Sequence, residues 1–216
     1  MNLRSRTLLA VEFIAIFIGI PLALVFDKPI IPPIPLLWLM AVYCLVALYR
    51  DPEFRRSQLW NPRPLQSQLA SIFLLFAAGI ALMCWLMHEL APGLLFTFVR
   101  THPLVWFLVM LLYPVLSVYP QGIIYRAFML HRYRHLSGTS EQRKWALILL
   151  SALAFSLMHV VFRNWVAVLL TFAGGILFAR RHIETRSLFV SSFEHALYGC
   201  FVFTVGLGQF FYVRLV

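Results

Sequence analysis

Several ionisable side chains interrupt the long apolar runs of this sequence, where packing alone gives no reason for them. They include Arg126, His159 and the adjacent pair Glu194 and His195. Inside a bilayer such a group costs about 2.5–3.5 kcal/mol on insertion scales, so each one is a candidate for function. Carboxylates and imidazoles exchange protons, and a guanidinium can hold a carboxylate through two hydrogen bonds. These residue types favour either hydrolysis or the binding of an anionic or peptide ligand.

The two histidine regions each allow a structural and a functional interpretation. His159 lies four residues after Phe155, on the same helix face, and could simply bond a neighbouring carbonyl. His195 could position a water molecule or an oxyanion, with Glu194 as a catalytic acid or a supporting group. Because adjacent helical residues point about 100° apart, these two side chains cannot both face one point squarely.

Arg126 raises the question of its partner. Its structural explanation is a guanidinium that extends to the lipid headgroups, and its functional one is a guanidinium that orients a carboxylate. The chain has only eight acidic residues. Glu194 is the natural partner, either at a functional site or as a packing contact, and Glu12 is the second candidate.

Membrane-spanning helices are the elements that must position these side chains. The chain of 216 residues is 62% hydrophobic and 12% charged, which is about half the charge fraction of a soluble domain. A bilayer core needs about 20 apolar residues per helix. The candidate spans are 7–26, 34–49, 68–88, 103–120, 146–162, 165–180 and 187–212. The sequence therefore predicts an all-α polytopic membrane helix bundle of seven spans in one domain, residues 1–216.

Residues 121–130 are apolar enough to re-enter the bilayer after Pro120, which would add an eighth, broken segment. Unless this segment dips inward, Gln121 lies near the cytoplasmic surface. Whether Gln121, His159 and His195 reach one cavity is therefore the decisive spatial expectation.

Basic residues cluster between the apolar runs, and their distribution predicts the orientation. With a cytoplasmic N-terminus, the inner loops and boundaries hold 14 of the 18 lysine and arginine residues, against 4 outside. This bias follows the positive-inside rule and fits a bacterial inner membrane. The net charge of +10 belongs to these loops, so no nucleic-acid partner is expected. The three cysteines lie in apolar runs without metal-ligand spacing and are expected to be buried hydrophobes.

Three stretches resemble, in order, the pattern of the CPBP family of intramembrane endopeptidases, also called the CAAX-protease or bacteriocin-processing (Abi) family. That pattern is Glu-Glu-x-x-x-Arg, then Phe-x-x-x-His, then His-x-x-x-Asn. Here the stretches read "QGIIYR" (121–126), "FSLMH" (155–159) and "HALYG" (195–199), within a family-like core of about 103–212. The resemblance implies metal-free peptide hydrolysis, in which a glutamate activates water while the histidines and the asparagine position it and stabilise the oxyanion.

The match departs from the pattern at the residues that would do the chemistry. The motif arginine and both histidines are present, but Gln121 and Gly122 stand at the two glutamate positions and Gly199 stands at the asparagine position. Glutamine keeps a hydrogen-bonding shape but cannot accept a proton as a base. Glu194 is then the best remaining candidate for the base. The candidate catalytic residues are His159, His195, Glu194, Arg126 and Gln121.

Three functions remain open. The chain could be an active peptidase with its base supplied from another position. It could keep the peptidase fold without proteolysis, binding a membrane-embedded or lipid-associated peptide, a lipid or a partner protein in the former active-site cavity. It could also be a transporter or subunit unrelated to proteolysis. No cofactor and no obligatory metal are expected, because Glu194 and His195 are adjacent and neither they nor His159 has a second ligand at i, i+4 spacing.

Overall fold

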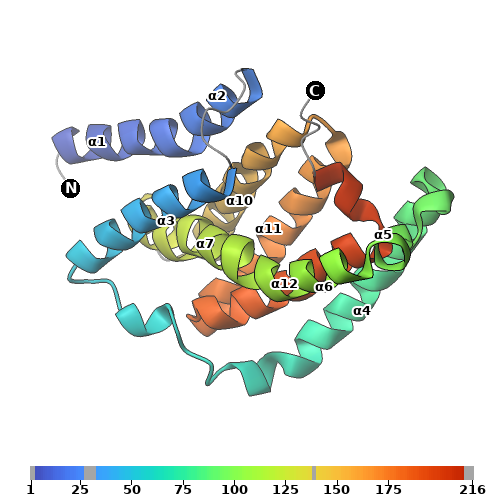
Figure 1. The fold of residues 1–216 in the computed structure, drawn as a ribbon. Coiled ribbons are helices and arrows are strands. Elements are labelled where there is room, and N and C mark those ends of the chain that lie inside the picture. The colour runs from blue at the N-terminus through green and yellow to red at the C-terminus, as the bar shows by residue number, and fades with distance from the viewer. Residues whose placement is uncertain (1–2, 27–32, 138–139, 212–216) are drawn as a thin grey trace.

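Helices make up most of the chain that the structure describes, which is residues 3–26, 33–137 and 140–211 of a computed structural model (Figure 1). The α-helices are α1 (Leu3–Ile14), α2 (Ile20–Phe26), α3 (Pro33–Arg50), α4 (Leu65–Leu90), α5 (Thr97–Thr101), α6 (Pro103–Tyr113), α7 (Tyr119–Gly122), α8 (Met129–Arg132), α9 (Arg134–Ser137), α10 (Glu141–Met158), α11 (Trp165–Thr185) and α12 (Leu188–Val205). The π-helical segments are η1 (Ala15–Gly19), η4 (Pro114–Val118) and η5 (Ile123–Phe128), and the 3₁₀ segments are η2 (Arg56–Gln58), η3 (Pro92–Leu94), η6 (His159–Phe162) and η7 (Leu207–Phe211).

Seven stretches of this helical chain are long and apolar enough to cross a membrane, which confirms the predicted all-α polytopic bundle. The spans are Thr7–Phe26, Pro33–Arg50, Leu65–Leu90, Pro103–Arg132, Glu141–Phe162, Trp165–Thr185 and Leu188–Val205. Five of the seven predicted runs begin and end within about five residues of these bounds. The fourth extends well beyond residue 120, and the seventh ends before residue 212.

The fourth span is the main correction to the predicted organisation. Residues 121–130 do not re-enter the bilayer as a separate segment, because they continue the same helix to Arg132. Pro114 and Pro120 lie inside this span, and a proline cannot donate to the carbonyl four residues earlier. The helix continues through π-helical turns. A side chain of another helix contacts each of the two carbonyls that the prolines leave without their usual donor. Trp38 Nε1 of α3 donates to the Leu116 carbonyl at 3.1 Å, and Cys200 Sγ of α12 lies 4.0 Å from the Met110 carbonyl.

The last three spans form the centre of the bundle (Figure 1). Helices α10 and α11 approach closely at Gly175, where an added Cβ would lie 2.8 Å from the Ala152 Cα. This is the small-residue packing that membrane helices favour. Ser156 Oγ also donates to the Val168 carbonyl between these helices at 2.8 Å. Helix α4 packs along α12, while α3 packs along the fourth span at η5.

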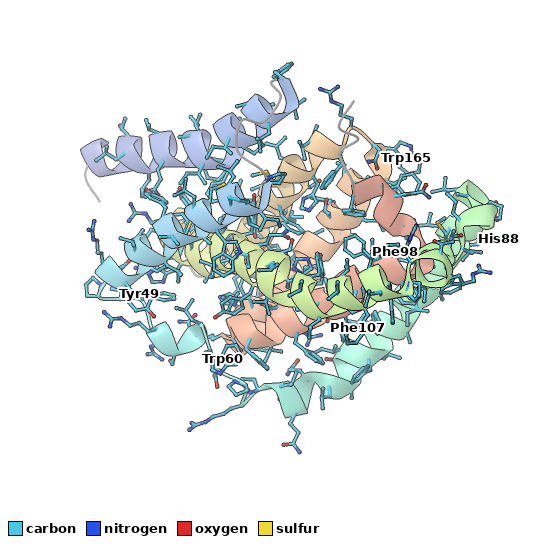
Figure 2. The ribbon with its side chains drawn as sticks, viewed as in Figure 1. Tyr49, Trp60, His88, Phe98, Phe107 and Trp165 are labelled. Carbon is cyan, nitrogen blue, oxygen red and sulfur yellow. The ribbon has the colours of Figure 1, made fainter. Side chains whose placement is uncertain are left out.

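The outer surface of the bundle is apolar. Figure 2 shows large aromatic side chains on the outside, among them Phe107 of α6 and Trp165 at the start of α11, which are 56% and 60% exposed. A soluble domain rarely shows contiguous apolar surface on this scale, whereas a multi-pass membrane protein presents it to the lipid chains. The chain is a multi-pass membrane protein.

Glu12 in the first span has partners that exclude it as the counter-ion of Arg126. Its carboxylate accepts two hydrogen bonds from the Arg132 guanidinium, both at 3.0 Å, one from Tyr133 Oη at 3.1 Å and one from Tyr43 Oη at 3.0 Å. This network joins the first span to α3 and to the end of the fourth span. The prediction that Glu12 could serve Arg126 is wrong, because four donors already occupy it.

Candidate functional site

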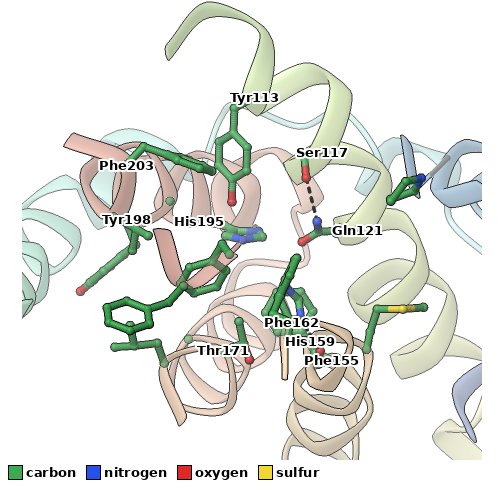
Figure 3. A pocket seen from close by; sticks show the side chains of 18 of the residues that line it. Tyr113, Ser117, Gln121, Phe155, His159, Phe162, Thr171, His195, Tyr198 and Phe203 are labelled. Carbon is green, nitrogen blue, oxygen red and sulfur yellow. Dashed lines mark hydrogen bonds between the residues drawn. The ribbon is translucent and has the colours of Figure 1, made fainter. Parts of the chain in front are cut away.

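A cavity of about 1660 Å³ lies among α3, α4, the fourth span and the last three spans. Its wall is mostly leucine, valine, phenylalanine and methionine. Figure 3 shows a smaller group of polar side chains converging on it from three spans: Gln121 from α7, His159 after α10, and His195 from α12. The expectation that these three side chains face one cavity is confirmed, because all three line it. Their convergence depends on the fourth span continuing past residue 121.

Gln121 presents an amide to the cavity. Its Nε2 donates to Ser117 Oγ, one turn earlier, at 2.8 Å, as the dashed line in Figure 3 shows. Its Oε1 is buried and has no hydrogen-bond partner among the described residues. The side chain thus keeps the shape of a glutamate and offers one unused acceptor, but it carries no group that takes a proton at neutral pH.

His159 lies just after the last turn of α10. Its Nδ1 is 2.7 Å from the Phe155 carbonyl oxygen. A carbonyl can only accept, so Nδ1 carries the hydrogen and Nε2 of the neutral ring is left with a lone pair. The ring also packs edge-on against Phe155, with centroids 4.6 Å apart. The structural interpretation, an imidazole bonded to a neighbouring carbonyl, therefore holds together with the functional one, an imidazole at the cavity.

His195 is enclosed by aromatic rings. It stacks on Phe178 at 4.5 Å between centroids, and Phe155 packs edge-on against it at 5.5 Å. Only 5% of the residue is exposed, and its Nδ1 has no partner within the described chain. Because Phe155 contacts both imidazoles, this one ring fixes the position of His159 relative to His195.

Arg126 is held by aromatic faces rather than by a carboxylate. Its guanidinium carbon lies 4.3 Å from the centre of the Phe155 ring and 5.3 Å from that of Phe178. The residue is 1% exposed, and neither terminal nitrogen has a hydrogen-bond partner among the described residues. Two cation–π contacts offset part of the cost of this burial. Arg126 is not among the residues that line the cavity, but both rings that cover it are, so its charge lies directly behind the wall.

Glu194 pairs with a different arginine, which corrects the predicted site. Its carboxylate accepts from Arg181 Nε at 2.9 Å and from Arg181 Nη2 at 3.0 Å, and Glu194 and Arg181 are 0% and 5% exposed. Arg181 Nη1 also donates to Gln68 Oε1 and to Ser71 Oγ of α4. The prediction that Glu194 serves Arg126 is wrong, whereas its alternative as a packing contact with a buried arginine is confirmed. Glu194 does not line the cavity, because its side chain points toward α4 and α11 while that of His195 points inward.

Several polar residues that line the cavity are missing from the predicted set, and two of them lie on the same helix as Gln121. Tyr113 and Ser117 line the cavity beside Gln121 (Figure 3). The three are spaced at i, i+4 and i+8, which places them on one helix face. That spacing is visible in the sequence and is the signal that identifies them. Arg181 is also absent from the predicted set, because it was expected in a loop at 181–186 and instead lies inside α11.

The lining has donors, acceptors and apolar surface, but no carboxylate among its described residues. Amide, imidazole and hydroxyl groups can bind the backbone of a peptide or the head of a lipid, while the leucine and phenylalanine wall suits a hydrocarbon chain. No cluster of three or more histidine, cysteine, aspartate or glutamate side chains that could hold a metal ion occurs in the described ranges. The arrangement is suited to bind an amphiphilic ligand, and it lacks the usual acid–base group.

Comparison with known proteins supports the resemblance of the three motifs. Residues 100–201 match a family model described as Rce1-like, type II CAAX prenyl endopeptidase. The matched range begins just before α6 and ends within α12, so it contains all three motifs and most of the lining residues of the last four spans. No curated protein and no solved structure matches the chain.

Proposed function

We propose that the chain, which over residues 100–201 is similar to intramembrane CAAX-type proteases, is a relative of the CPBP family that binds a lipid-modified peptide in its cavity without cleaving it. The peptide is part of a membrane-embedded or lipid-associated protein. The apolar wall receives the lipid chain, and the polar group of Gln121, His159 and His195 receives the peptide backbone. Arg126 sets a positive potential behind this group, and Phe155 holds the two imidazoles in place.

The observation that carries the proposal is the absence of a carboxylate from the described lining of the cavity. Hydrolysis of a peptide bond needs a group that takes a proton from water, and a positioned general base contributes about 10²- to 10⁴-fold to such a rate. Gln121 stands where the family pattern has a glutamate, and Glu194 is held by Arg181. Binding needs only the donors and the apolar wall, and these are present.

Gln121→Glu is the sharpest test, because it changes one amide to a carboxylate of the same shape. Wild-type protein in detergent or nanodiscs is expected to bind a fluorescent farnesylated peptide, measured by anisotropy, and to leave it uncleaved by mass spectrometry. The Gln121→Glu variant is expected to gain cleavage, because the carboxylate then lies in the same cavity as both imidazoles. Gln209→Glu is the matched control: it adds the same charge to the cavity lining through a residue of η7 rather than of the motif.

The control and the His195→Ala variant make the outcomes decisive. His195→Ala is expected to weaken peptide binding, since it removes an imidazole from the polar group. Cleavage by the Gln209→Glu variant as well would mean that any carboxylate suffices and that Gln121 has no special place. Failure of the wild type to bind the peptide would overturn the proposed function.

Gly122→Glu is a poorer route to a restored base. An added Cβ at Gly122 would lie 2.9 Å from Leu188 Cδ1 and 2.9 Å from Ser192 Oγ, so this position faces the start of α12. A glutamate there would press on that helix before it reached the cavity. We therefore expect no gain of cleavage from Gly122→Glu, in contrast to Gln121→Glu.

A second candidate, an active peptidase with a histidine base, is favoured by the geometry of His159. Because Nδ1 donates to the Phe155 carbonyl, the free lone pair is on Nε2. That nitrogen could take a proton from water while His195 and the Gln121 amide contact the peptide. Cleavage of the farnesylated peptide by the wild type, lost in His159→Ala, would support this candidate against the binding function.

We further propose that residues 1–216 form one membrane domain in a bacterial inner membrane, with the N-terminus in the cytoplasm. The excess of lysine and arginine in alternate loops supports this orientation. With the fourth span ending at Arg132, Arg134 and the start of α10 at Glu141 lie on the cytoplasmic side. A cysteine placed at Arg143 should then react with an impermeant reagent only after the cells are opened.

A further inference from the structure

The ring of Tyr113 in α6 occupies the position that a side chain at Gly199 of α12 would need. A Cβ added at Gly199 would lie 2.7 Å from Tyr113 Cζ and even closer to its Cε1 and Oη. Side chains never pack at such distances, so Tyr113 can take its present position only because residue 199 has no side chain. The Tyr113 ring is held there by Phe203, edge-on at 5.2 Å, and by His195, edge-on at 6.4 Å.

The Tyr113 hydroxyl lies at the polar end of the cavity. Figure 3 shows it directed toward His195, across from Ser117 and Gln121. Tyr113 lines the cavity, and none of the hydrogen bonds between described residues involves its hydroxyl. A phenylalanine would fill the same space against Phe203 and Gly199, so packing alone does not account for the hydroxyl. A hydroxyl that lines the cavity without a protein partner is free to donate a hydrogen bond to a ligand acceptor.

We propose that the Tyr113 hydroxyl donates a hydrogen bond to a carbonyl oxygen of the ligand's peptide part, beside His195. The donor reaches the cavity from α6, and the missing side chain at Gly199 makes the room for it. This inference rests on the proposed function, because it names the ligand group that the polar end of the cavity recognises. It makes Tyr113 a specificity residue: it distinguishes a lipid chain that carries a peptide from a bare hydrocarbon.

Tyr113→Phe tests the hydrogen bond, since it removes one oxygen and keeps the ring. A neutral hydrogen bond contributes about 0.5–1.5 kcal/mol, so affinity for the farnesylated peptide should fall by roughly 3- to 10-fold. An isoprenoid hydrocarbon of the same length has no acceptor, and its ability to compete for the cavity should not change. An equal loss for both ligands would show that Tyr113 acts through packing, and it would overturn the inference.

A double-mutant cycle tests the shared space. Gly199→Asn alone is expected to lower thermal stability and peptide affinity, because asparagine and Tyr113 cannot both fit. Tyr113→Ala alone should lose the donor. The double variant gives asparagine the vacated room and a donor amide, so it should bind the peptide more tightly than Tyr113→Ala and melt above Gly199→Asn. Additive losses would refute the coupling.

These outcomes separate the two proposals. If the wild type binds the farnesylated peptide and Tyr113→Phe binds it equally well, the role of Tyr113 is refuted and the proposed function stands. If the wild type does not bind the peptide, both fail. A farnesylated peptide that is bound by the wild type and weakened selectively by Tyr113→Phe supports both.

Discussion

The buried ion pair between Arg181 and Glu194 is expected to join three helices rather than to do chemistry, and Glu194→Gln tests this role. The pair links α11 to α12 through two hydrogen bonds, and Arg181 extends the contact to α4 through Gln68 and Ser71. Replacing the carboxylate with an amide keeps the shape of residue 194 and removes its charge. The guanidinium then stays buried with only neutral partners.

The expected loss of stability is large because both partners are buried. Arg181 is 5% exposed and Glu194 is 0% exposed, and removing one partner of such a pair costs about 3–5 kcal/mol. For a chain of this size 1 kcal/mol shifts the melting temperature by about 2–4 °C, so Glu194→Gln should melt about 6–20 °C below the wild type. Replacing both partners with apolar residues, as in Arg181→Met with Glu194→Leu, should recover most of this loss, because no charge is then left unpaired.

Thermal unfolding of the purified protein in detergent, followed by circular dichroism, measures these shifts. Glu184→Gln is the matched control, because it makes the same chemical change in the ion pair with Arg180 on α11. That pair is 57% and 43% exposed, and an exposed i, i+4 pair contributes about 0.3–0.5 kcal/mol. Its melting temperature should therefore stay close to that of the wild type.

Two results would refute the reasoning. One is a Glu194→Gln variant that melts as high as Glu184→Gln, which would mean that the pair contributes little. The other is a double variant with recovered stability that no longer binds the farnesylated peptide. Glu194 would then act at the cavity, and its assignment as a packing contact would be wrong.

Three further perturbations follow from the fold. Gly175→Val should lower the melting temperature, because the added Cβ would meet the backbone of Ala152 at 2.8 Å and overpacking costs about 1–3 kcal/mol. Gly93→Val is the control and should have a much smaller effect, because nothing lies within 4 Å of a Cβ added there. Arg126→Met should leave the melting temperature unchanged or raise it, because it removes a buried charge that has no carboxylate partner; a loss above about 3 kcal/mol, as for a broken buried pair, would contradict this. Burial alone would raise the pKa of Asp51, but hydrogen bonds from a backbone N–H and an imidazole, with a nearby guanidinium, lower it overall. The stabilising effect of the Asp51 carboxylate should therefore be complete above about pH 4, the pKa of an unfolded aspartate. It should disappear as the pH falls through the lower pKa of the folded state. Asp51→Asn should abolish this part of the acid dependence of unfolding.

Local sequence was sufficient to find the seven spans and to place Gln121, His159 and His195 at the cavity, but the ends of the fourth and seventh spans were wrong. Transfer into lipid depends on the composition of about 20 consecutive residues, so a hydropathy count finds each helix without knowledge of its neighbours. The count failed at Pro120, where a proline suggests an end. There the helix continues because α3 and α12 take up the carbonyls that the prolines leave without a donor. Only neighbouring spans supply those groups.

The sequence by itself determined that this is a seven-span helical membrane protein whose motifs resemble those of a peptidase family, with an amide where that pattern has a glutamate. Those properties follow from residue types and from spacing along one helix. The tertiary structure decided which charges pair: Glu194 binds Arg181, Glu12 binds Arg132, and Arg126 lies against aromatic rings. It also decided that the Tyr113 ring occupies the position that a side chain at Gly199 would need. The physical reason is that a contact between helices depends on their relative rotation and depth, and neither quantity is recorded in the periodicity of a single helix.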